Sequence, residues 1–166
     1  NPSAASVKWS NRHKGIGADG LVLIGKSTVA DFSMRIFNAD GSEAMMCGNA
    51  SRCIGKFVYE NALTRKNEIS LGTLSGIKRL MLDVSNNKVK SVTVDMGTPS
   101  FSNPQQVATT DGSFHEKEFE VNGTTYYGTY ICMGNPHLVI WVEDVESVPL
   151  QDVGPLLESD PIFPEK

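Results

Sequence analysis

The stretch that decides the fold runs from residue 44 to residue 59 and reads Ala44-Met45-Met46-Cys47-Gly48-Asn49-Ala50-Ser51-Arg52-Cys53-Ile54-Gly55-Lys56-Phe57-Val58-Tyr59. Its apolar residues recur every three or four positions, which places them on one face of a helix. They are Ala50, Cys53, Ile54, Phe57 and Val58. The pattern predicts a helix from Ala50 to about Asn61 that buries this apolar stripe.

Alternating apolar residues on both sides of this helix predict strands. The expected strands are Leu21–Ile24, which should be buried, Phe32–Phe37, residues 80–84, residues 89–96, Phe119–Val121, Thr124–Met133 and Leu138–Val142. Turn residues indicate two hairpins, at Ser85-Asn86-Asn87 and at Asn122-Gly123. We expect a bend at Gly134–His137 and short helices at Ser3–Ser10 and Leu150–Glu158. A sheet wrapped around the long helix would bury both, so the sequence predicts an α+β fold.

A change of pattern near residue 97 indicates a boundary. Gly97-Thr98-Pro99 interrupts the alternation, and a polar stretch from Ser100 to Asp111 follows. We therefore expect one domain over residues 1–96 and a second over residues 97–166.

The composition is that of a globular protein and excludes several classes. Of 166 residues, 40% are hydrophobic and 20% charged, and the net charge is −4. Without a basic face we expect no nucleic-acid partner, and without a long apolar run we expect no membrane span. The three cysteines and three histidines show no metal-ligand spacing, so we expect no metal and no disulfide framework.

Two glycine-rich strings resemble nucleotide-binding motifs but stand in the wrong context. Gly15–Gly20 matches the dinucleotide fingerprint, yet polar residues precede it and a strand follows it. Gly20–Ser27 matches a phosphate loop, but its Leu-Val-Leu-Ile run favours an extended strand. We expect neither to bind a nucleotide.

Cys47 stands where the long helix begins, a position that favours negative charge. Gly48 and Asn49 follow it, so backbone N–H groups there could hold a carboxylate while the dipole favours thiolate over thiol. Such a site suits removal of a proton from the α-carbon of an amino or hydroxy acid. A small buried residue is the alternative interpretation of Cys47. Cys53 and Cys132 are both expected to be core residues.

The segments Asn38-Ala39-Asp40-Gly41-Ser42-Glu43-Ala44, Met46-Cys47-Gly48-Asn49 and Arg52-Cys53 resemble the signature of the diaminopimelate epimerases. Flanking stretches match the same family. They are Arg12-His13, Gly15–Gly20, Met133–His137 and Gly154–Glu158.

The resemblance implies a cofactor-independent isomerase that interconverts LL- and meso-diaminopimelate, on the route to lysine and peptidoglycan. Cys47 would be one of two cysteines that exchange a proton with opposite faces of the α-carbon. His137 would lie close to the reacting centre. The substrate-binding residues would be Asn38, Gly48, Asn49 and Asn135. The family fold implies two pseudo-symmetric lobes with the site in the cleft between them. It also implies a cytoplasmic homodimer acting on a small-molecule substrate.

The sequence departs from the family pattern at three places. It starts after the family's first, glycine-rich strand, and Ala50 stands where glycine is frequent. The family's second cysteine lies in a Gly-Ser-Gly-x-Cys segment that this sequence lacks. We therefore expect a first lobe without its first strand, the beginning of a second lobe, and no epimerisation by these residues alone. Two alternatives stay open: another isomerase of this fold, similar to proline racemase or phenazine-biosynthesis proteins, and a non-catalytic module that binds a small anion.

Overall fold

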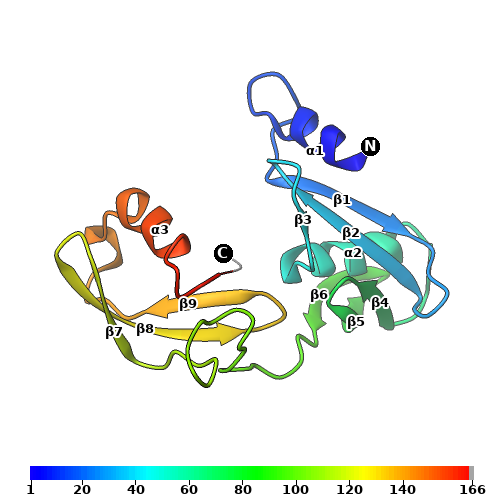
Figure 1. Cartoon of the computed structure of the whole chain (residues 1–166). Helices are drawn as coiled ribbons and strands as arrows, with labels where there is room; N and C mark the ends of the chain where they lie inside the picture. Colours follow the sequence, from blue (N-terminus) through cyan, green and yellow to red (C-terminus); the bar gives the residue numbers. More distant parts are fainter. Residues whose placement is uncertain (165–166) are drawn as a thin grey trace. The chain divides into compact units, whose positions relative to one another are not determined.

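The computed structural model describes residues 1–164 and has a mixed α+β architecture, which confirms the predicted fold class. The chain forms two compact units, Asn1–Gly97 and Thr98–Lys166, which are coloured blue to green and green to red in Figure 1. Each unit is described by itself below. No helix within residues 1–164 is long and apolar enough to cross a membrane.

The first unit is a mixed sheet with two helices (Figure 1). The chain order is α1 (Pro2–Ser10), β1 (Gly20–Gly25), β2 (Phe32–Asn38), β3 (Glu43–Ala44), α2 (Gly48–Glu60), β4 (Glu68–Thr73), β5 (Gly76–Ser85) and β6 (Lys88–Val94). The strands lie in the order β1-β2-β4-β5-β6, and β3 pairs with β2. Only the pairing of β2 with β4 is parallel, and it joins Phe32 to Leu71 and Ser33 to Gly72.

Helix α2 packs against β5 and β6 and fills the core of this unit. It begins at Gly48, two residues before the predicted start, and its buried residues are Ser51, Ile54, Gly55, Val58 and Tyr59. The predicted stripe is therefore correct at Ile54 and Val58 but wrong at Cys53, which is exposed, and at Phe57, which is 50% exposed. The buried face is rotated because Gly55 lets the sheet come close: a Cβ at Gly55 would lie 3.2 Å from Cγ1 of Val92.

The strand expected at Leu21–Ile24 exists, but the prediction that it is buried is wrong. Its residues are half-buried or exposed, and Ile24 is 37% exposed. The reason is its place at the edge of the sheet, where it pairs with β2 alone. The glycine-flanked run is nonetheless a strand and not a phosphate loop.

Both predicted hairpins are confirmed, and each has a two-residue turn. Asn86 and Asn87 join β5 to β6 with φ values of 53° and 58°. Asn122 and Gly123 join the first two strands of the second unit with φ values of 52° and 76°. Positive φ at both positions gives a turn whose twist matches that of the paired strands.

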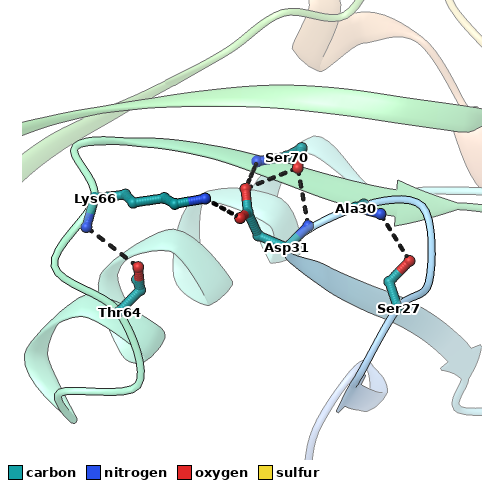
Figure 2. A network of polar contacts seen from close by, with 6 residues as sticks. All are labelled: Ser27, Ala30, Asp31, Thr64, Lys66 and Ser70. Carbon is teal, nitrogen blue, oxygen red and sulfur yellow. Dashed lines mark hydrogen bonds and ion pairs between the residues drawn. The ribbon is translucent and has the colours of Figure 1, made fainter.

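A polar cluster around Asp31 fastens the β1–β2 hairpin to β4 (Figure 2). The Asp31 carboxylate accepts hydrogen bonds from the Ser70 backbone N–H at 2.9 Å and the Ser70 hydroxyl at 2.8 Å. Lys66 Nζ donates to the other carboxylate oxygen at 2.5 Å. The Lys66 ammonium, followed by the Ser70 donors, lowers the pKa of Asp31 from 3.8 to about 2. The cluster reinforces the short parallel pairing of β2 with β4.

The second unit is a three-stranded antiparallel sheet with one helix. It contains β7 (Lys117–Val121), β8 (Thr124–Cys132), β9 (Pro136–Ile140), a 3-10 turn η1 (Val145–Ser147) and α3 (Leu150–Glu158). The bend predicted at Gly134–His137 is wrong in its second half, because Pro136 and His137 already pair with Cys132 and Ile131. A proline is tolerated there as the first residue of an edge strand.

The core of the second unit is small and lies beside an open cavity. Its buried cluster consists of Val107, Phe114 and Tyr130. A cavity of about 660 Å³ lies between the β8–β9 strands and α3. Its lining includes Leu138, Val153 and Leu157.

Candidate active site

Cys47 occupies the N-cap of α2, with an extended backbone at φ −145° and ψ 119°. Its sulfur accepts a hydrogen bond from the Ala50 N–H at 3.5 Å. Its carbonyl accepts from the Ser51 N–H and the Ser51 hydroxyl, each at 2.9 Å. The cysteine is half-buried, while Met46 before it is 6% exposed and belongs to the core of the first unit. The Cys47 backbone is thus fixed by Ser51, and its sulfur lies at the positive end of the helix beside the Ala50 N–H.

Gly48 and Asn49 form the start of α2, where backbone N–H groups have no carbonyl acceptor within the helix. The Asn49 side chain is exposed, and its oxygen accepts a hydrogen bond from Arg52. A Cβ at Gly48 would lie 3.4 Å from the Met96 sulfur, an ordinary van der Waals contact, so Met96 borders the helix start. This turn can donate hydrogen bonds to an anion beside the Cys47 sulfur.

Asn38 ends β2 and opens a tight turn to Ser42. Its backbone N–H donates to the Ser42 carbonyl at 2.8 Å, and its side-chain amide donates to the Ser42 hydroxyl at 3.0 Å. The Ser42 hydroxyl and N–H donate to Asp40 at 2.6 and 2.8 Å and hold the pKa of that carboxyl below its usual value. Asn38 is exposed at the end of its strand.

An ion pair ties the segment between Asn38 and Cys47 to the sheet. Arg35 Nε and Nη2 donate to the two Glu43 oxygens at 2.7 and 2.8 Å, and the Arg35 guanidinium lies 4.9 Å from the centre of the Phe37 ring. The pair lowers the pKa of Glu43 and raises that of Arg35. It fixes β3 on β2 three residues before Cys47. The sequence interpretation missed Arg35, although an arginine and a glutamate on the two sides of the predicted turn at residues 38–41 were visible in the sequence.

The residues predicted in the second unit share one strand end. Asn135 lies in the turn before β9, where its carbonyl accepts from the Met133 N–H at 3.1 Å, and His137 is the second residue of β9. Both are exposed, and both line the 660 Å³ cavity of that unit. The structure therefore groups Cys47, Gly48 and Asn49 in one helix start, places Asn38 in the same unit, and groups Asn135 with His137.

The other cysteines differ from their predicted settings. Cys53 was expected in the core, and that expectation is wrong. The buried face of α2 is rotated away from it, so Cys53 is exposed to solvent. Cys132 was also expected in the core. It packs against the buried cluster of the second unit but is itself half-buried. Within residues 1–164 there is no group of three or more histidine, cysteine or acidic side chains that could hold a metal ion.

Comparisons with a family model and with curated sequences point to the same family. The family model for diaminopimelate epimerase matches residues 2–102. A diaminopimelate epimerase of Phocaeicola vulgatus is 63% identical over all 166 residues, which cover 59% of its length. One of Parabacteroides distasonis is 57% identical over the whole chain, which covers 58% of its length. The chain thus spans a little under three fifths of these relatives.

Among solved structures, a hydroxyproline epimerase of Agrobacterium vitis is similar in fold. It superposes with a TM-score of 0.63 at 15% identity, and the match covers 89% of this chain and 40% of that one. At this level of identity the likeness concerns the fold alone. It agrees with a mixed sheet wrapped around a helix.

Proposed function

The chain belongs to the diaminopimelate epimerase family, and from that membership we propose that it contributes the Cys47 site of an enzyme that interconverts LL- and meso-diaminopimelate. The reaction requires no cofactor in this proposal, because thiol groups carry the proton. The product would serve lysine and peptidoglycan synthesis, and the working assembly would be a homodimer.

The observation that carries the proposal is the position of the Cys47 sulfur. It accepts the Ala50 N–H at the start of α2. A hydrogen-bond donor and the positive helix end both favour a negative charge at this position. As thiolate, Cys47 takes the α-proton of the substrate and becomes a thiol, while the electron pair of the C–H bond stays on the α-carbon. A second acid then protonates that carbon from the opposite face, and the configuration inverts.

In this proposal, backbone N–H groups and asparagine side chains bind the substrate. The N–H groups of Gly48 and Asn49 hold the carboxylate next to the reacting carbon, as expected for an anion at a helix start. Asn38 and Asn135 donate or accept hydrogen bonds with the polar groups of the substrate. We extend the proposal to His137, which the family resemblance assigns to the reacting centre.

The second acid is not assigned to either remaining cysteine. Cys53 lies on the exposed side of α2 and Cys132 at the end of β8, and neither stands in the family's Gly-Ser-Gly-x-Cys context. We therefore expect the 166 residues by themselves not to epimerise diaminopimelate. Full activity from this polypeptide would contradict the two-thiol mechanism.

The test uses a chimera in which these 166 residues replace the aligned segment of the Phocaeicola vulgatus relative. Epimerisation and exchange of the α-hydrogen in deuterated buffer are measured together. Cys47→Ala should lower kcat by at least about 1,000-fold, because an essential proton carrier is lost. Cys53→Ala is the matched control on the same helix and should stay within about twofold of the unsubstituted chimera. A Cys47→Ala chimera that retains its rate would overturn the proposal.

A further inference from the structure

The serine hydroxyls of α1 contact the turn that begins at Asn38. Ser6 is completely buried, and its Oγ lies 2.9 Å from the Phe37 carbonyl oxygen and 2.7 Å from the Asn38 carbonyl oxygen. A serine inside a helix usually bonds to a carbonyl of its own preceding turn. Ser6 instead directs its single hydroxyl proton to the carbonyl oxygens of the last two residues of β2, more than 30 positions away in the chain.

Ser3 provides a second contact at the other end of the same turn. Its hydroxyl donates to the Gly41 carbonyl at 2.7 Å. Ser3 and Ser6 are three residues apart and so face the same way on α1. The helix therefore bonds to the turn on both sides of residues Ala39 and Asp40.

The fit between α1 and this turn is close. A Cβ at Gly41 would lie 2.6 Å from the Ser3 Oγ and 3.0 Å from a methyl group of Val7. Gly41 also has φ +88°, a conformation that only glycine adopts easily. The turn is internally closed as well, because the Gly41 N–H donates to the Asn38 carbonyl at 2.9 Å. Movement of α1 would therefore be passed directly to the backbone of Asn38.

We propose that Ser6, assisted by Ser3, is a positioning residue that holds the Asn38 backbone in the place from which its side chain, itself bonded to the Ser42 hydroxyl at 3.0 Å, meets the substrate. The inference rests on the proposed function, in which Asn38 binds diaminopimelate. A binding group has to be held within about half an ångström of its productive position, and its own backbone must be fixed for that. The Ser6 hydroxyl fixes the Asn38 carbonyl, which is the backbone atom next to the turn.

The first test measures KM and kcat for diaminopimelate in the chimera, well below the melting temperature. Ser6→Ala should raise KM about tenfold and Ser3→Ala about threefold, with kcat within about twofold, because substrate binding is weakened without loss of the proton carrier. Ser10→Ala is the matched control. Ser10 lies on the same helix and is 4% exposed, but its backbone carbonyl accepts a hydrogen bond from the Ala18 N–H, which lies outside the Asn38 turn. An unchanged KM in Ser6→Ala, or an equal rise in Ser10→Ala, would overturn the inference.

The second test separates positioning from general stability by a double-mutant cycle. If Ser6 acts through Asn38, then Ser6→Ala should change KM by less than about twofold in a chimera that already carries Asn38→Ala. Where Ser6→Ala does not fold, the same cycle with Ser3→Ala decides. Additive effects, with Asn38→Ala itself raising KM, would overturn the inference and leave the proposed function intact. An unchanged KM in Asn38→Ala alone would overturn the substrate role of Asn38, and the inference with it.

Discussion

The two units differ in how completely they cover their sheets. In Asn1–Gly97 the helix α2 lies on the sheet and shares a buried cluster with it. That cluster contains Met34, Met46, Ile54, Val58, Tyr59, Ile69, Leu71, Leu80, Leu82 and Val89. Among the described residues of Thr98–Lys166 the buried cluster is Val107, Phe114 and Tyr130, and the strands border a cavity of about 660 Å³. Burial of apolar surface is the main source of stability, so the first unit should be the more stable.

The difference bears on the candidate site. Cys47 follows the core residue Met46 directly and caps a helix whose inner face is closed by the sheet. Asn135 and His137 line an open cavity instead. We infer that a packed core holds the site residues of the first unit in place. The site residues of the second unit, Asn135 and His137, lie at a strand end that borders the cavity and is held by fewer packed side chains.

The comparison is tested most strongly by matched truncations, Ile54→Ala and Leu138→Ala. Ile54 is 2% exposed inside the first core, so its truncation should lower the free energy of unfolding by about 2–5 kcal/mol. Leu138 is half-buried beside the cavity, so its truncation should cost about 1 kcal/mol.

The two units are followed separately during urea unfolding. In a Trp141→Phe background, the fluorescence of Trp9 reports the first unit. Trp141 is 82% exposed in the folded state, so the second unit is followed by hydrogen exchange of its peptides with mass spectrometry. Equal losses at the two sites would remove the distinction between the units.

The next largest effect concerns two aspartates with the same low pKa. Asp31 and Asp111 are each lowered from 3.8 to about 2, by Lys66 and Ser70 in one case and by the Ser113 hydroxyl and N–H in the other. Asp31 joins segments 39 residues apart, whereas the Asp111 bonds reach residues two positions away. Local bonds can persist in the unfolded chain. Asp31→Asn should therefore destabilise the first unit by about 1–2 kcal/mol, and Asp111→Asn should destabilise the second unit by clearly less.

The low pKa of Asp31 also predicts how the stability of the first unit changes with pH. A carboxyl whose pKa is lower in the folded state stabilises the fold above its unfolded value and loses that contribution as the pH falls. The Asp31 contribution should thus be complete above about pH 4 and should disappear between 3.8 and about 2. Urea midpoints followed by Trp9 should drop over that interval, and the drop should shrink in Asp31→Asn. An identical acid profile for the variant would show that Asp31 contributes no net stability.

The smallest expected effect lies in the two hairpin turns. The second unit already has glycine at the second turn position, while the first has Asn87 there at φ 58°. Asn87→Gly should raise the melting temperature of the first unit by about 1–3 °C, because glycine adopts this conformation with less strain. The reverse exchange, Gly123→Asn, should lower that of the second unit by a similar amount. Thermal melts that move in the opposite directions would contradict this reading of the turns.

The local features of the fold were predictable from the sequence because they depend on neighbouring residues. The helix that follows Cys47, the Asn86-Asn87 turn and the helix at Leu150–Glu158 all follow from short patterns, although the predicted start of α2 was two residues late. The exposed side of α2 was not predictable in the same way, since the closeness of Val92 to Gly55 depends on how the sheet packs. The edge position of β1 and the Asp31–Ser70 bonds likewise join distant segments.

The candidate site shows the same division. The motif around Cys47 pointed to its place at a helix start, which needs no knowledge of tertiary structure. The contacts of Ser3 and Ser6 with the Asn38 turn link residues more than 30 positions apart and were not anticipated. The sequence showed only that Ser3 and Ser6 lie three residues apart on a predicted helix and therefore face the same side.

The start of α2 is proposed to make Cys47 the most reactive of the three cysteines, and alkylation of the folded 166-residue chain tests this most directly. Mass spectrometry would follow iodoacetamide labelling of each cysteine at pH 7. We predict that half-buried Cys47 reacts faster than exposed Cys53. Equal labelling rates for the cysteines would contradict the proposed role of Cys47.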